Sequence, residues 1–88
     1  MKLIIAIIRD VDNDPVSQSL IAAGFRVTRI ASTGGFFRRG SSTLMIGVAD
    51  EKLEEALSTL RKGLAPSSDA NSRRATLFVL NIENFTQI

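Results

Sequence analysis

The chain has 88 residues, a length typical of a single domain with one hydrophobic core. It contains no cysteine and no histidine, which excludes disulfides, thiolate nucleophiles, imidazole bases and zinc sites built on either residue. Its 11 basic and 9 acidic residues leave a net charge of +2, which is too small to indicate a nucleic-acid partner. These absences remove most classes of enzyme, and we expect no catalytic residue and no metal site.

The sequence also contains no segment that predicts membrane insertion or export. Residues 3–8 form an apolar run that is too short for a signal peptide and lacks a cleavage site of small residues. No segment approaches the roughly 20 apolar residues of a membrane span. Together with the missing disulfides, these features predict a cytoplasmic protein without membrane insertion.

The first predicted elements are a buried strand and a helix. Residues 3–8 are rich in β-branched side chains, and their unbroken apolar run predicts a central strand buried on both faces. Asp14 and Pro15 supply an N-cap and a first helical residue, so we expect the helix to begin there. Apolar residues then recur at helical spacing until Gly24, which favours a left-handed helix end.

An edge strand and an unusual loop follow. From Phe25 the hydrophobic period falls to two, as expected of a half-exposed edge strand. Residues 33–35, Thr-Gly-Gly, interrupt this strand, and residues 36–42 add two phenylalanines and two arginines. Glycine N–H groups and guanidinium attract phosphate, and an aromatic ring stacks on a base, so the loop suits a nucleotide. An ordinary turn whose phenylalanines pack on the core is the alternative.

The second half of the chain repeats the strand and helix pattern. Residues 43–48 predict a third strand, and Asp50 is expected to cap a helix that ends at Gly63. Residues 64–74 predict a surface loop, residues 75–80 a last strand, and residues 81–88 a short tail.

The order βαββαβ is the split pattern of ferredoxin-like α+β folds. It predicts a single domain over residues 1–88, in which two helices cover one face of a four-stranded antiparallel sheet. The first, third and fourth strands carry apolar side chains on both faces. Two helices cannot cover both faces, and monomers rarely expose so large an apolar patch. We therefore expect a closed homo-oligomer, with loop or tail residues folded across the sheet as the alternative.

Several stretches, taken in order, resemble the PII-like cyclic di-AMP receptors. They are residues 1–7, 24–28, 33–40 and 75–80, followed by Phe85 and Gln87. The resemblance covers the whole chain except residues 64–74. It implies a homotrimer of ferredoxin-like subunits that binds cyclic di-AMP in the clefts between neighbours, performs no catalysis and needs no cofactor. Ligand binding would order the loop at residues 34–42, and an unidentified downstream protein would recognise the ordered loop.

Carried onto matching positions, the resemblance implies a set of ligand-binding residues. Phe36 would lie beside an adenine, while Arg26 and Thr28 would hold the phosphodiester ring or the second base. The complete set is Arg26, Thr28, Gly35, Phe36, Phe37, Ser41, Gly47, Phe78 and Gln87.

Two departures from the family pattern affect this expectation. Ser41 and Ser42 stand where the family usually has Asn-Thr, so a two-sided amide contact to an adenine edge is lost. Residues 64–74 replace a longer loop, which leaves the cleft less covered. Affinity or base choice is therefore expected to differ from that of the family.

Four alternatives follow from the same residues. The first two are a PII-like regulator of another adenine nucleotide or phosphorylated metabolite, and a structural oligomer without a ligand. An acylphosphatase-like hydrolase would need a phosphate loop after the first strand, where residues 9–12 are acidic and free of glycine. An RNA-recognition module would need aromatic side chains on the middle strands, and the first and third strands have none.

Overall fold

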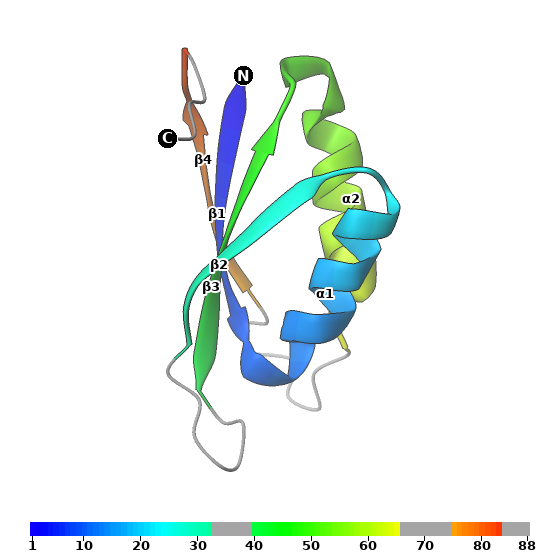
Figure 1. The fold of residues 1–88 in the computed structure, drawn as a ribbon, viewed down its shortest axis with the longest axis vertical. Coiled ribbons are helices and arrows are strands. Elements are labelled where there is room, and N and C mark those ends of the chain that lie inside the picture. The colour runs from blue at the N-terminus through cyan, green and yellow to red at the C-terminus, as the bar shows by residue number, and fades with distance from the viewer. Residues whose placement is uncertain (33–39, 66–74, 84–88) are drawn as a thin grey trace.

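Two helices lie on one side of an antiparallel sheet. The computed structural model describes residues 1–32, 40–65 and 75–83. In chain order the elements are β1 (Lys2–Arg9), α1 (Asp10–Ala22), β2 (Arg26–Ser32), β3 (Ser41–Val48), the 3₁₀ helix η1 (Asp50–Lys52), α2 (Leu53–Gly63) and β4 (Ala75–Asn81). Figure 1 shows the sheet edge-on, with α1 and α2 on the same side. The predicted ferredoxin-like α+β arrangement is confirmed.

The strand order is β2-β3-β1-β4, and all three pairings are antiparallel. The most apolar strand, β1, lies between β3 and β4, and Ile4 pairs with Ile46 on one side and Val79 on the other. The predicted central position of β1 and edge position of β2 are both confirmed. A register shift between Arg29 and Ala31 interrupts the ladder of β2 and β3.

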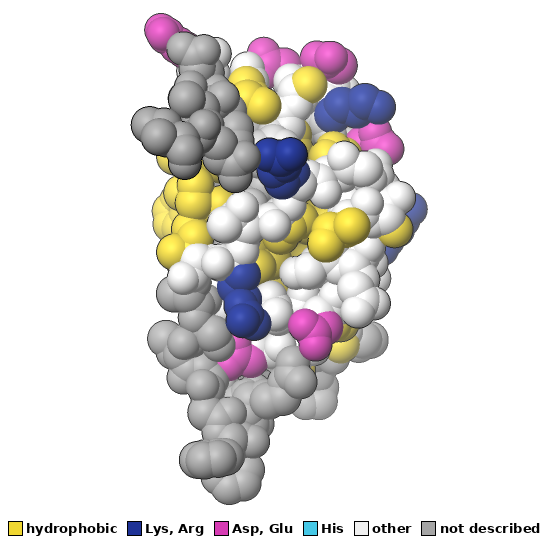
Figure 2. Space-filling view, in the orientation of Figure 1, with side chains coloured by type: hydrophobic (Ala, Val, Ile, Leu, Met, Phe, Trp, Pro, Cys, Tyr) yellow, Lys and Arg dark blue, Asp and Glu magenta, His cyan; other side chains and the backbone are white. Residues whose placement is uncertain are grey.

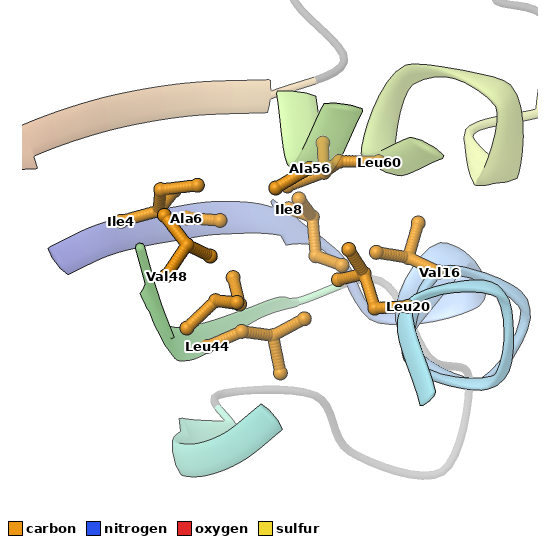
Figure 3. Close-up of a cluster of buried hydrophobic side chains, with 10 residues drawn as sticks. Ile4, Ala6, Ile8, Val16, Leu20, Leu44, Val48, Ala56 and Leu60 are labelled. Atoms are coloured by element: carbon orange, nitrogen blue, oxygen red, sulfur yellow. The ribbon is translucent and has the colours of Figure 1, made fainter. Parts of the chain in front are cut away.

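The hydrophobic core lies between the sheet and the two helices. Alternate residues of β1 and β3 face the helices, because successive side chains of a strand point to opposite faces. Figure 3 shows these side chains meeting those of α1 and α2. The buried set is Ile4, Ala6, Ile8, Val16, Leu20, Leu44, Ile46, Val48, Ala56 and Leu60.

Helix α1 begins earlier than the sequence predicts. It starts at Asp10 rather than at Asp14, so Pro15 lies inside the helix instead of at its first position. The side chains of Asp10 and Asp12 are buried and accept hydrogen bonds from residues far along the chain. Those bonds stabilise the additional helical turn, and helical periodicity cannot reveal them because the partners are distant in sequence.

Glycine occurs near the ends of both helices, at positions 24 and 63, for two different structural reasons. Gly24 has a φ of 93°, the left-handed conformation predicted for it, and the N–H of Phe25 donates to the carbonyl of Leu20 at 2.9 Å. Gly63 is the last residue of α2, and a Cβ there would lie 2.9 Å from the Cα of Val16. Since that distance is too short for two carbon atoms, glycine at this position lets α1 and α2 touch.

Asp50 does not cap α2 as predicted. The 3₁₀ helix η1 precedes α2, and neither helix has a side-chain cap hydrogen bond among the described residues. The Asp50 carboxylate instead lies 2.9 Å from the N-terminal ammonium group of Met1. The sheet brings them together, because Lys2 pairs with Val48 just before Asp50. The hydrogen bond from the ammonium group lowers the pKa of Asp50 below its ordinary value.

No helix among the described residues covers the opposite side of the sheet. Ile7, Phe78 and Leu80 there are 37%, 50% and 47% exposed, and Figure 2 shows hydrophobic side chains along the side of the molecule away from the helices. The prediction of a sheet that is apolar on both faces is confirmed. We call this side the open face, and the residues used below are Leu3, Ile5, Ile7, Arg26, Thr28, Ser41, Met45, Gly47, Phe78 and Leu80.

Candidate functional site

Five of the nine predicted ligand-binding residues lie on the open face, four of them in two neighbouring cross-strand rows. Directly paired residues of an antiparallel sheet share a face, so the register assigns each side chain to one side. One cross-strand row runs Arg26, Gly47, Leu3 and Leu80, and the next runs Thr28, Met45, Ile5 and Phe78. Arg26, Thr28, Gly47 and Phe78 are therefore on the same surface, with apolar side chains between them.

Arg26 and Gly47 also line a pocket at the end of the sheet. They are directly paired, and Arg26 is exposed. The pocket has a volume of about 320 Å³ and opens where α1 ends and η1 begins. Its lining consists of Ala23, Gly24, Phe25, Arg26, Gly47, Val48, Ala49 and Lys52. Two cationic side chains beside a hollow of this size suit an anionic ligand group.

Lys52 is a pocket residue that the sequence analysis missed. Its side chain is more than half exposed, and its ammonium group lies 3.5 Å from a carboxylate oxygen of Glu55. In the sequence it belongs to the charged segment before α2, which predicts a solvated helix surface. The pairing of Arg26 with Gly47 brings Arg26 and Lys52 to the same pocket, and this pairing cannot be read from the residues around Lys52.

Gly47 has room for a side chain within its own chain. A Cβ built there meets only the Met1 Cε among the described atoms, at an ordinary contact distance of 3.9 Å. Its φ is not in the left-handed range, so the backbone does not require glycine either. A glycine that neither packing nor backbone requires fits a position which a second molecule approaches closely.

The predicted site residues do not converge within one subunit. Arg26 and Thr28 lie on β2 and Phe78 on β4, the two edges of the sheet, so three strand spacings of about 4.8 Å put the edges about 14 Å apart. Ser41 pairs with Arg9 at the far end of β3, about 20 Å from Gly47 at the usual rise per residue. The remaining predicted residues, Gly35, Phe36, Phe37 and Gln87, lie outside the described residues.

The structure separates the roles of Ser41 and Ser42. Ser41 is exposed and lies on the open face. Ser42 points to the helix side, is 1% exposed, and its hydroxyl group donates to the carboxylate of Asp10. Ser42 therefore links β3 to the start of α1, and its side chain has no access to a ligand on the open face.

Two further properties of the described residues bear on function. They contain no group of three or more carboxylates or other ligating side chains placed to hold a metal ion. Neither α1 nor α2, within the ranges described, has the length and hydropathy needed to cross a membrane.

Comparison with known proteins assigns the chain to a family. A crystal structure of a functionally unknown protein from Pediococcus pentosaceus ATCC 25745 superposes with a TM-score of 0.75 and is 30% identical in sequence. The match covers 99% of this chain and 96% of that chain. The sequence model of the cyclic-di-AMP receptors matches residues 1–70, which is most of the chain. The protein therefore belongs to the cyclic-di-AMP receptor family.

Proposed function

We propose that this protein is a cytoplasmic signal-transduction receptor that binds cyclic di-AMP between the subunits of a homotrimer. One ligand would occupy each cleft between neighbouring subunits, and the protein would carry out no chemistry on it. Family membership supports the ligand. The arrangement of the open face supports a site shared between subunits.

One observation supports a site shared between subunits: the residues that match the family's ligand-binding positions lie far apart on one surface of the subunit. Arg26 and Thr28 lie at the β2 edge and Phe78 at the β4 edge of the same open face. A closed ring of identical subunits uses a different patch on each side of every interface. In such a ring the β2 edge of one copy faces the β4 edge of its neighbour. The ligand residues would then meet without any rearrangement of the subunit.

The side chains suit the chemistry of a cyclic dinucleotide. Its two phosphodiester groups are anionic, and a guanidinium group such as that of Arg26 donates two parallel hydrogen bonds to phosphate oxygens. The Thr28 hydroxyl adds a donor on the same side of β2. The exposed ring of Phe78 offers an apolar surface to an adenine. The apolar residues between them would be buried against the neighbouring subunit.

Signalling would follow from the segment that joins β2 to β3. Binding would order this segment up to Gly40, since Ser41 and Ser42 already pair with β1 as part of β3. A downstream protein would distinguish the ordered form from the ligand-free form. A receptor for another adenine nucleotide and a purely structural oligomer remain outcomes of the experiment below.

Isothermal titration with cyclic di-AMP tests the proposal, with cyclic di-GMP and ATP as competitors and the oligomer verified by light scattering. We expect one ligand per subunit and at least micromolar affinity. Arg26→Ala removes a hydrogen-bonding cation, which is worth about 1.5–3 kcal/mol, so binding should weaken about 10- to 150-fold. Arg29→Ala is the matched control, because Arg29 pairs with buried Leu44 and so lies on the other side of β2.

Each result has a defined meaning. Loss of affinity in Arg26→Ala with unchanged affinity in Arg29→Ala supports the open face as the binding surface. Equal effects of both variants would indicate general electrostatic attraction only. Binding of ATP in preference to cyclic di-AMP would assign a different nucleotide, and no heat with any of the three would overturn the receptor function.

A further inference from the structure

The junction between β1 and α1 contains buried polar groups that the ligand site does not use. Asp10 is 6% exposed and Asp12 is fully buried, although both residues begin a helix that packs on an apolar core. A buried carboxylate is costly unless hydrogen bonds and a countercharge compensate it. Their partners therefore show which parts of the chain this junction holds in place.

Asp10 holds the beginning of β3. Its backbone N–H donates to the carbonyl oxygen of Gly40 at 3.0 Å, and its carboxylate accepts a hydrogen bond from the buried hydroxyl group of Ser42. Gly40 and Ser42 lie directly after the segment at residues 33–39. One aspartate thus fixes the point at which the proposed ligand-binding segment joins the sheet.

Asp12 holds the end of the segment that follows α2. Its Oδ1 accepts a hydrogen bond from the N–H of Ala65 at 3.0 Å, and its Oδ2 lies 2.7 Å from Nε of Arg9. A terminal guanidinium nitrogen of Arg9 also donates to the carbonyl oxygen of Ala65 at 2.7 Å. Both backbone groups of Ala65 are therefore bound to one ion pair, directly before residues 66–74.

We call the bonds of Asp10 to Gly40 and Ser42 the first attachment, and the bonds of Asp12 and Arg9 to Ala65 the second attachment. Both attachments start from one turn of helix. Asp10 and Asp12 are two positions apart in the first turn of α1, where β1 runs into the helix (Figure 1). Within one turn the residues are about 1.5 Å apart along the helix axis and are joined to the next turn by backbone hydrogen bonds, so their relative positions are tightly constrained. A shift of Gly40 and Ser42 would therefore act on the same turn that carries the carboxylate bound to Ala65.

We propose that Asp10 and Asp12 are positioning residues which couple the stem of the ligand-binding segment, at Gly40 and Ser42, to the stem of the second connection, at Ala65. The regulatory part of this inference rests on the proposed function, since it takes residues 34–42 as the ligand-binding segment. Ligand binding would tighten the attachment of Ala65, and an intact Ala65 attachment would strengthen ligand binding by the same factor.

Amide hydrogen exchange by NMR tests the coupling in the ligand-free protein. The reporters are the amides of Asp10 and Ala65, and the amide of Ile46 in the core corrects for changes in global stability. Ser42→Ala removes the hydroxyl group at the first attachment, and Arg9→Lys removes the guanidinium fork at the second. We expect each variant to accelerate exchange at both reporters, by about 5-fold or more at the remote one.

A control variant separates coupling from general loosening. Thr59→Ala removes a hydroxyl group that donates to the Glu55 carbonyl at 2.8 Å within α2, and it should change neither reporter relative to Ile46. If Ser42→Ala accelerates only the Asp10 amide, and Arg9→Lys only the Ala65 amide, the two attachments are independent. That result overturns the coupling whether or not any ligand binds.

A second arm adds cyclic di-AMP at saturating concentration. We expect the ligand to slow exchange of the Ala65 amide about 5-fold or more in the wild-type protein, and to do so much less in Ser42→Ala. Binding without any change at Ala65 would overturn the regulatory role. Absence of binding would instead contradict the proposed function, while the ligand-free arm would still decide whether the two stems are coupled.

Discussion

Replacement of Leu80 by lysine tests whether subunits assemble through the open face. Leu80 is 47% exposed in the single chain, so complete burial would add roughly half of a leucine's 1.5–3 kcal/mol, or about 1 kcal/mol. Lysine does not provide this burial energy. It also brings an ammonium group into the interface without an opposite charge to pair with it, which costs several kcal/mol more. A closed trimer repeats this penalty in every subunit. We therefore expect Leu80→Lys to be monomeric at concentrations where the wild-type protein is a trimer.

Sedimentation velocity is the measurement for this prediction, with Ile21→Lys as the matched control. Ile21 is 61% exposed on α1, on the helix side of the molecule, so its replacement should leave the oligomer intact. Both positions are exposed in the single chain, so neither replacement should change the stability of the subunit itself by much. An unchanged mass for Leu80→Lys, or a monomeric wild-type protein, would refute the assignment of the open face as the interface.

Two glycines and one aspartate give further predictions. Gly63→Ala should lower the free energy of unfolding by about 1–2 kcal/mol in urea, because overpacking against Val16 costs about 1–3 kcal/mol and better helix propensity recovers up to about 1 kcal/mol. Gly47→Ala should leave unfolding unchanged but weaken cyclic di-AMP binding, and a stability loss there would contradict the reasoning. The pKa of Asp50, measured by NMR titration, should lie below the ordinary value of 3.8, because the hydrogen bond from the N-terminal ammonium group favours the charged carboxylate. Its contribution to stability is then present above pH 3.8 and is lost as the pH falls through the lower folded-state pKa, whereas a midpoint at or above 3.8 would contradict the ion pair.

Much of the fold follows from local patterns in the sequence. The apolar run that became β1 lies in the centre of the sheet, and the shorter period after Phe25 predicts an edge strand, which β2 is. Gly24 ends α1 in the predicted left-handed conformation. These features depend on residues close together in the chain, so periodicity and turn chemistry are sufficient to predict them.

Only part of the candidate site could be predicted from the sequence. The resemblance implies that Arg26, Thr28, Gly47 and Phe78 bind the ligand, and the register places all four on one face. It could not show that Arg26 and Thr28 lie at one edge of the sheet and Phe78 at the other, since that depends on strand order. Lys52 had no sequence signal, because its place in the same pocket as Arg26 depends on the pairing of β2 with β3.

The sequence alone determined the element order, the apolar character of both sheet faces and the family. Each of these properties depends only on residue types and on patterns among neighbouring residues. Only the tertiary structure decided that α1 begins at Asp10, that Asp50 pairs with the N-terminus and that Gly63 makes room for Val16. It also decided that Ser42, and not Ser41, faces the helices and donates a hydrogen bond to Asp10. In each of these cases the deciding contact joins residues far apart in the chain, and only the packing of the sheet and helices brings them together.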